Sequence, residues 1–368
     1  MTIGWIVLGQ GPRLRWGGDI RRHYLLRPLA CTVKAKAASS WTAGALRSAL
    51  DETGNGRPRL ASVELLDVEA LSIARARTVP TVLDFHDEPI AHAAALGHSM
   101  SPTRAAELRS QAESNLAAFK YVIAQSPEFI KLVGLDPKST LVAPSGTDTS
   151  RIVPGPWPEE PVVGLVSGAS PGRGIEALVD ACRRIAIEVP GLRLWMALAG
   201  TTDAGRVYLQ QLKESLREEA WVTVDMVPYQ ELGPRLAASW VLVVPHPSDP
   251  YWDAVLPIKM FDYLAAGRPI VATPRAATAA LLQRHRAGLI TAGDEPEQLA
   301  EPIVRLLRDE ELARRIGAAA RSAAETTYDW AIVGRQLADD VIRREERILW
   351  LRRRIRVARN RLAGRRWA

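Results

Sequence analysis

The sequence holds only two cysteines and six histidines among its 368 residues. Cys31 and Cys182 lie far apart, and neither belongs to a C-x-x-C pair. A structural zinc site or a disulfide framework needs cysteines at short spacings, so the sequence argues against both and favours a reducing, cytoplasmic environment. His92, His98 and His285 are predicted to lie in helices or loops without partners, and no D-x-D pattern marks a metal-dependent site. We therefore expect no metal and no cofactor.

Long apolar runs are also missing. No stretch approaches the roughly 18 apolar residues of a membrane-spanning helix. The apolar run at the N-terminus, "IGWIVLG", is too short for a secretory signal, and arginines follow it. We expect no signal peptide.

The net charge of +7 is concentrated at one end of the chain. Residues 343–368 carry 11 arginines and two glutamates, whereas the remaining 37 basic and 39 acidic residues nearly cancel. A nucleic-acid-binding domain places its lysines and arginines on one face of its globular part. We therefore expect no nucleic-acid partner.

The glycine fingerprint of a dinucleotide site is incomplete. The loop after the first predicted strand reads "GQGPRL", and Leu14 stands where G-x-G-x-x-G requires its third glycine. A dehydrogenase is therefore poorly supported. Gly17 and Gly18 come next, and they fit either a close approach of the backbone to a ligand or a flexible turn.

Strand-like and helix-like segments alternate along most of the chain. Runs such as "TVLDF" and "VVGLVSG" predict buried strands, and "GIEALVDACRRIAIEV" has helical period. The proline-rich stretch 154–161, "PGPWPEEP", separates two such series. We predict an α/β protein with two doubly wound parallel sheets, in domains over 1–155 and 156–335, followed by a helix and basic tail over 336–368. Ligands of such sheets bind beyond the carboxyl ends of the strands, in the cleft between the domains.

The stretch 253–274, "DAVLPIKMFDYLAAGRPIVATP", joins a turn, a helix and a strand. Pro257 suits the start of a helix, and the free N–H groups of a first turn attract anions. Lys259 and Asp262 are three residues apart and share a helix face. A cation for phosphate and a carboxylate for ribose hydroxyls suit a nucleoside diphosphate. An ordinary βαβ unit with a solvated lysine and aspartate would have the same pattern.

The segment "LPIKMFDYLAAGRPIVAT" resembles the donor site of glycosyltransferase family 4, retaining enzymes of the GT-B fold, in which P-x-K-x-x-E-Y-x-A-x-G-x-P-V-V-A-T is common. Five more segments follow the family's order, to about Gln336: "GGDIRRHYLLRPLA", "DFHDEP", "VIAQSPEF", "LVAPSGTDTSRI" and "GRGIEALVDA". The resemblance implies two Rossmann-like domains that face each other across a cleft, with a basic C-terminal helix added here.

The resemblance also implies roles for single residues. His86, at a strand end, would contact the transferred sugar, although a lone histidine is more often structural. Asp262 would act in donor binding and catalysis. The implied donor-binding residues are Gly17, Gly18, Arg173, Val227, Tyr229, Leu256, Pro257, Ile258, Lys259 and Asp262.

Some positions depart from the family's pattern. The first acid of E-x7-E is replaced by Ala254, with Asp253 beside it as a possible substitute. Arg173 stands for the lysine of K-G, and Gly168 stands for the arginine five residues earlier. We expect these changes to affect the binding of the donor's phosphate and sugar more than the fold.

The function that the resemblance implies is retaining transfer of a sugar from a UDP-, GDP- or other nucleotide sugar to a hydroxyl of a lipid-linked or polysaccharide acceptor. Two alternatives stay open: a catalytically weak nucleotide-sugar or glycan-binding subunit, and a GT-B nucleotide-sugar epimerase. A binding subunit would hold donors without transfer, and an epimerase would convert its donor without an acceptor.

The basic tail predicts a continuous helix. Ile348, Leu351, Ile355 and Leu362 recur at helical spacing, and arginines fill much of the remaining circumference. Such a helix is typical of contact with an anionic membrane surface, which would place the protein at the inner face of the membrane. Packing across the two domains, or binding to an acidic partner, are the alternatives.

Overall fold

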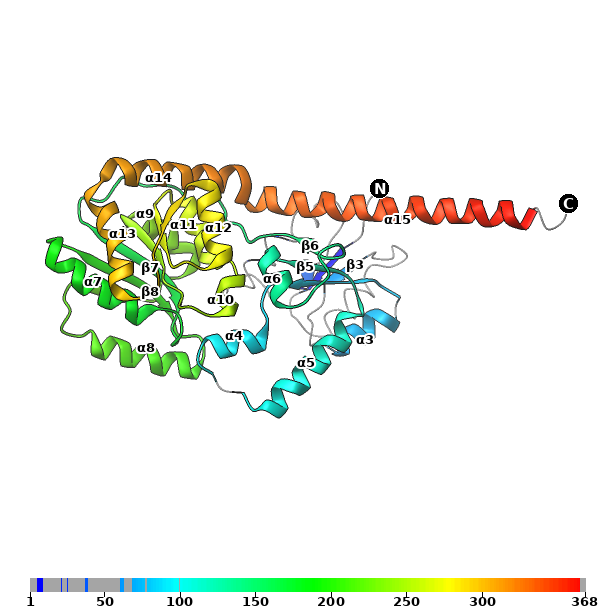
Figure 1. Ribbon diagram of the computed structural model, residues 1–368, viewed down its shortest axis with the longest axis horizontal. Coiled ribbons are helices and arrows are strands. Elements are labelled where there is room, and N and C mark those ends of the chain that lie inside the picture. The colour runs from blue at the N-terminus through cyan, green and yellow to red at the C-terminus, as the bar shows by residue number, and fades with distance from the viewer. Residues whose placement is uncertain are drawn as a thin grey trace.

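The computed structural model describes residues 5–8, 21, 25, 37–38, 60–62, 68–76, 78–98 and 100–364. These residues form two parallel β-sheets with helices packed around them, joined by an extended segment (Figure 1). We call the part built on the first sheet the N-terminal domain and the part built on the second sheet the C-terminal domain. The predicted limits of the two domains stay a prediction.

The first sheet has the strand order β2-β1-β3-β4-β5-β6, and its described pairs are all parallel. Its strands are β1 (Trp5–Leu8), β2 (Ala37–Ala38), β3 (Leu60–Ser62), β4 (Thr81–Phe85), β5 (Phe119–Ala124) and β6 (Leu141–Val142). Its helices are α3 (Val68–Ala76), α4 (Pro89–Ala95), α5 (Pro102–Leu116) and α6 (Pro127–Leu132). The sequence predicted β1 and β4, but it did not indicate β2, β3 or α3.

The second sheet has the order β12-β11-β10-β7-β8-β9, again with parallel pairs. Its strands are β7 (Val162–Gly168), β8 (Arg193–Ala199), β9 (Val222–Asp225), β10 (Val241–Val244), β11 (Ile270–Ala272) and β12 (Gly288–Ile290). Its helices are α7 (Ile175–Glu188), α8 (Asp203–Ser215), α9 (Leu232–Ala237), α10 (Pro250–Ala254), α11 (Ile258–Ala265), α12 (Ala276–His285), α13 (Pro296–Arg308) and α14 (Glu310–Ala323). Strand order reverses between β7 and β10, as in a doubly wound dinucleotide-binding fold.

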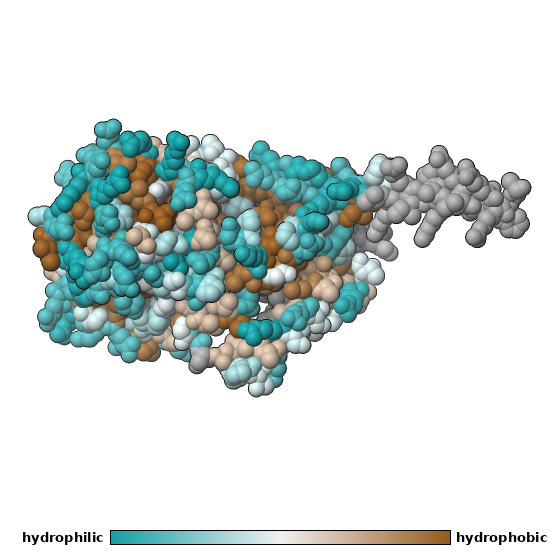
Figure 2. Space-filling view, in the orientation of Figure 1, coloured by the Kyte–Doolittle hydropathy of each residue, from teal (hydrophilic) through white to brown (hydrophobic). Residues whose placement is uncertain are grey.

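Burial on both faces explains the apolar character of the second sheet. All four residues of β10 are buried, and the helices covering the sheet complete two large cores on its opposite sides. A parallel sheet covered by helices on both faces is expected to read as a near-continuous apolar run. Outside the cores, hydrophilic residues cover most of the face shown in Figure 2, with smaller apolar patches among them.

The segment Pro154–Pro161 has neither helix nor strand, as predicted for a linker. Arg268, which is buried, holds it in place. Its guanidinium donates to the carbonyl oxygens of Gly155 (3.1 Å) and Pro156 (2.6 Å) and lies 4.4 Å from the ring centroid of Trp157. The linker is therefore packed against the C-terminal domain.

The last helix, α15 (Trp330–Gly364), returns from the C-terminal domain to the first sheet. Trp330, Val333, Leu337 and Val341 are buried in the same core as strands β4 and β5. Beyond that core the helix continues past the body of the molecule, toward the C-terminus marked in Figure 1. The predicted continuous helix is confirmed for the residues described. Across the described chain, no helix combines the length and the apolar character that crossing a membrane would require.

Candidate functional site

A cavity of about 940 Å³ lies between the two domains. Its C-terminal wall follows β7, β8, β9 and β10, at the point where the strand order of the second sheet reverses, which is where such sheets bind ligands. Its N-terminal wall comes from the ends of β4 and β5 and from α4. The predicted residues that line it are His86, Arg173, Val227, Tyr229, Leu256, Pro257, Ile258, Lys259 and Asp262. Gly17 and Gly18 lie outside the described residues.

Lys259 enters this cavity from the first turn of α11. The residue is buried, and its Nζ has no hydrogen-bond partner in the described chain. Burial and the nearby Arg173 guanidinium lower the pKa of Lys259 to about 7. A buried amine without an acceptor is costly, and an anion at this place would remove that cost.

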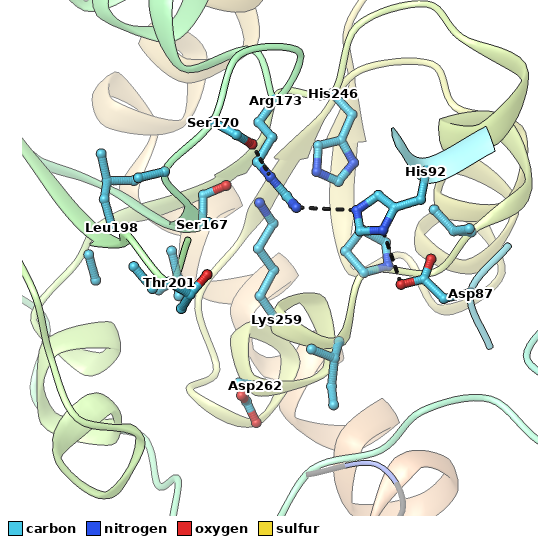
Figure 3. Close-up of a pocket in the computed structure, with 18 of the residues that line it drawn as sticks. Asp87, His92, Ser167, Ser170, Arg173, Leu198, Thr201, His246, Lys259 and Asp262 are labelled. Atoms are coloured by element: carbon cyan, nitrogen blue, oxygen red, sulfur yellow. Dashed lines mark hydrogen bonds and ion pairs between the residues drawn. The ribbon is translucent and has the colours of Figure 1, made fainter. Parts of the chain in front are cut away.

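Arg173 lies in the loop between β7 and α7 and points toward Lys259 (Figure 3). Its Nε donates to Ser170 Oγ (3.0 Å), and its Nη2 lies 3.4 Å from His92 Nε2. A Cβ at Gly168 would lie 3.3 Å from Arg173 Nε, so the glycine leaves the space that the guanidinium occupies. The Arg173 guanidinium thus lies against Gly168, the position at which the family pattern has an arginine.

Asp262 lies one turn after Lys259 on α11 and is buried. Its Oδ1 accepts hydrogen bonds from Thr147 Oγ1 (2.8 Å) and, at the limit of distance, Tyr229 OH (3.5 Å). Burial raises the pKa of Asp262 to about 7, although these bonds oppose the shift. The Tyr229 ring is itself held by the Arg151 guanidinium, 3.8 Å from its centroid.

The turn before α11 is fixed by the N-terminal domain. Leu256 N–H donates to Gln125 Oε1 (2.8 Å), and Ser126 Oγ donates to the carbonyl of Ala254 (2.8 Å). Asp253, considered above as a substitute acid, is not among the residues that line the cavity. Instead it is half-exposed and pairs with Arg275 (3.4 Å).

His86 follows β4 on the N-terminal wall. Its Nδ1 lies 3.2 Å from the carbonyl oxygen of Asp84 and 3.5 Å from the carboxylate Oδ2 of the same residue. Both neighbours are acceptors, so in the neutral ring Nδ1 carries the proton and Nε2 is left as an acceptor.

Arg21 holds Asp84 in turn. Its Nη2 donates to Asp84 Oδ1 (2.9 Å) and to the carbonyl oxygen of Ala143 (2.8 Å), and both charged side chains are buried. Burial raises the pKa of Asp84, but the Arg21 guanidinium and the His86 ring together outweigh it, and the net shift is downward. His86 is therefore oriented by a carboxylate that stays ionised.

Two histidines of the cavity were missed from the sequence. His92 was expected to lack partners, but its Nδ1 pairs with Asp87 Oδ2 (3.2 Å) and its ring stacks on Tyr251. His246 stacks on Trp252 at 4.0 Å, and neither of its ring nitrogens has a partner in the described chain. Burial, followed by Lys259 and Arg173, lowers the pKa of His246 well below its ordinary value. Its position just after the apolar strand β10 could have predicted that His246 lines the cavity, because ligands bind beyond the carboxyl ends of such strands.

The expectation for His285 was also wrong, because its Nε2 lies 3.0 Å from Tyr328 OH. His285 does not line the cavity, whereas His98 does. Across the described residues, no group of three or more His, Cys, Asp or Glu side chains could hold a metal ion.

Residues 160–309 match the model of the family described as Glycosyl transferases group 1. We call the part of the C-terminal domain that holds this match the group 1 domain. The family recognised from sequence motifs is thereby confirmed for this part of the chain.

Curated relatives share about a quarter of their residues with the chain. An alpha-maltose-1-phosphate synthase of Mycolicibacterium smegmatis is 26% identical over 55% of this chain and 56% of its own length. A GDP-mannose-dependent alpha-(1-6)-phosphatidylinositol monomannoside mannosyltransferase of Mycobacterium tuberculosis is 27% identical over 53% of this chain and 54% of its own length. The chain thus spans about half the length of the curated relatives it matches.

Solved structures match both domains, not the group 1 domain alone. Sucrose-phosphate synthase from Thermosynechococcus elongatus has a TM-score of 0.68 at 15% identity, covering 94% of this chain and 100% of its own. Anabaena HepE in complex with UDP has a TM-score of 0.69 at 16% identity, covering 92% of this chain and 99% of its own. These likenesses confirm the predicted GT-B arrangement of two Rossmann-like domains.

We expect Lys259 to titrate near pH 7 in the free protein. Replacing Arg173 by glutamine should raise the pKa of Lys259, because it removes a neighbouring positive charge that disfavours the protonated amine. NMR of labelled lysine side chains would measure both values, with Lys259→Arg used to assign the resonance. A lysine that titrates at its ordinary value in both proteins would contradict this account of the site.

Proposed function

We propose that the protein is a retaining glycosyltransferase that moves a sugar from a nucleotide sugar to an acceptor hydroxyl. The observation that carries the proposal is the buried, unpartnered Lys259 beside Arg173 at the reversal point of the group 1 domain, with Asp262 one turn away. Diphosphate would bind the two cations and the amides at the start of α11. Ribose hydroxyls would donate to Asp262, and the base would lie near Val227 and Tyr229.

The proposed reaction breaks the bond between the sugar's anomeric carbon and the diphosphate oxygen and forms a bond to the acceptor oxygen on the same face. The acceptor's proton passes to an oxygen of the departing diphosphate. Lys259 and Arg173 stabilise the charge that develops there. The two carboxylates that line the cavity in the described part of the chain are already engaged, Asp87 with His92 and Asp262 with Thr147, so neither is assigned as a nucleophile.

Two relatives bear on the substrates. HepE binds UDP in its solved complex, and the mycobacterial relative is named for GDP-mannose and a phosphatidylinositol mannoside. They support a nucleotide-sugar donor and a lipid-linked or other glycan acceptor. The base and the sugar are open to the experiment below. The two alternative functions, a binding subunit and an epimerase, are the results of the experiment that would replace sugar transfer as the function.

A panel of UDP-, GDP- and ADP-sugars tests the proposal. A donor at 100 times its Kd should stabilise the protein by about 2.7 kcal/mol in thermal denaturation.

Asp262→Asn should weaken binding of the donor found in this way by about 1.5–3 kcal/mol, the range for hydrogen bonds to charged groups. Asp253→Asn is the matched control, because Asp253 lies outside the cavity, and it should leave the affinity unchanged. Binding without transfer, or conversion of the donor without acceptor, would replace the proposal by an alternative.

We expect His86→Ala to lower kcat about 10- to 100-fold while the Kd for the nucleotide stays constant. The physical reason is that Nε2 of His86, an acceptor oriented by Asp84, would bond a sugar or acceptor hydroxyl in the transition state. Steady-state kinetics and calorimetry on the same preparation separate the two quantities. A loss confined to melting temperature would assign His86 a structural role.

We further propose that the end of α15 binds an anionic membrane surface. Arg344 donates to the carbonyls of Ser139 (2.5 Å) and Thr140 (2.9 Å), and Glu345 accepts from Tyr121 OH (2.5 Å), so α15 is fixed to the N-terminal domain up to this point. Beyond it, residues 347–368 carry nine arginines and no acidic residue. Each basic residue near an anionic bilayer contributes about 1 kcal/mol.

Deletion of residues 347–368 should release the protein from anionic vesicles, while activity on a soluble acceptor stays intact. The deletion starts after Glu345 because removing that contact would disturb the N-terminal domain. Co-sedimentation at low and high salt measures binding, with zwitterionic vesicles as the control, since salt screens the attraction. Full-length protein that stays in the supernatant at low salt would refute the membrane role.

A further inference from the structure

We propose that His92 is a positioning residue that orients Arg173 from the opposite domain, so that the N-terminal domain sets the geometry of a donor-phosphate group in the C-terminal domain. The inference rests on the proposed function, because it takes Arg173 to bind diphosphate. It adds a residue on α4 to the proposed diphosphate site, whose other groups, Lys259, Arg173 and the amides at the start of α11, belong to the group 1 domain.

The proton positions along this contact are fixed by chemistry. Arginine keeps its protons and can only donate, so His92 Nε2, 3.4 Å from Arg173 Nη2, must be the acceptor. The imidazole proton is then on Nδ1, which lies 3.2 Å from Asp87 Oδ2. Asp87 also accepts a hydrogen bond from Tyr251 OH. Tyr251, Asp87, His92 and Arg173 therefore form one chain of donors and acceptors that crosses between the domains twice. Dashed lines in Figure 3 mark two of its contacts, from Asp87 to His92 and from His92 to Arg173.

Packing makes the contact specific. His92 stacks on Tyr251 with the ring centroids 5.0 Å apart and the planes 13° apart, which fixes the imidazole plane. The loop that carries Arg173 lies directly against the end of α4. Gly172 has a φ of +72°, and a Cβ there would overlap the carbonyl oxygen of Ala95. A backbone-to-backbone approach of this kind sets the position of α4, and hence of His92, relative to the loop.

The remaining contacts of Arg173 come from its own domain. Ser170 Oγ accepts from Nε, and the guanidinium lies 5.5 Å from the ring centroid of Trp252. The Nε contact leaves the guanidinium free to turn about its long side chain, whereas the His92 contact at Nη2 holds its far end. Without His92, the Arg173 guanidinium must give up its rotational freedom when it binds phosphate. The affinity for the nucleotide then falls by that entropic cost.

The test measures binding of UDP by calorimetry in four proteins: the parent, His92→Phe, Arg173→Ala and the double variant. Phenylalanine keeps the ring stacked on Tyr251 but removes the acceptor. We expect His92→Phe to raise the Kd about tenfold, and to have no further effect when Arg173 is already alanine. His92→Gln, which can return an oxygen acceptor near Nε2, should restore most of the affinity.

The matched control is His285→Phe. His285 is also a partly buried histidine bonded to a tyrosine hydroxyl and packed on its ring, but it lies outside the cavity. The His285→Phe variant should have a lower melting temperature and an unchanged Kd for UDP. Additive effects of His92→Phe and Arg173→Ala, or no rescue by glutamine, would overturn the inference. No effect of Arg173→Ala itself would instead overturn the proposed diphosphate site.

Discussion

Lys259, which is buried, and Arg173, which is partly buried, face the same cavity, and no salt bridge to a carboxylate satisfies either one in the described chain. Burial of a charge without a partner is among the most costly arrangements in a protein. The lowered pKa of Lys259, caused by burial and by Arg173, expresses that cost. Both residues stand on the side of the carboxyl ends of a sheet that helices cover on both faces, Arg173 in the loop after β7 and Lys259 in the first turn of α11. A dianionic ligand would relieve both groups at once.

The same constraint explains why the site needs two domains. The N-terminal domain contacts three parts of the donor site: Gln125 bonds the turn before α11, Thr147 bonds Asp262, and His92 bonds Arg173. The contacts at Asp262 and Arg173 are hydrogen bonds to groups that the ligand is proposed to use. Helix α15 then returns the chain to the N-terminal domain, so the two sheets are joined at two places. Small changes in how the domains meet must therefore alter the donor site directly.

The sequence was most informative where one physical rule acts alone. The pattern of apolar residues predicted β7, α7, α11 and β11 of the C-terminal domain, because that sheet is buried on both faces. Prolines marked the linker Pro154–Pro161, because they disfavour both helix and strand. In the N-terminal domain the short strands β2 and β3, of two and three residues, were missed because so few residues carry no detectable period.

The partners of His92 and His246 could not be predicted, since they depend on which loops meet in space. Asp87 and His92 are close in sequence, but their contacts with Tyr251 and Arg173 join residues about 80 or more positions apart. The departure at Gly168 has a related explanation. Read alone, a glycine in place of arginine indicates a lost phosphate contact, yet the missing side chain makes room for the Arg173 guanidinium. A one-residue pattern records the loss, whereas Arg173, which we propose compensates for it, stands five positions later and contacts His92 of the other domain.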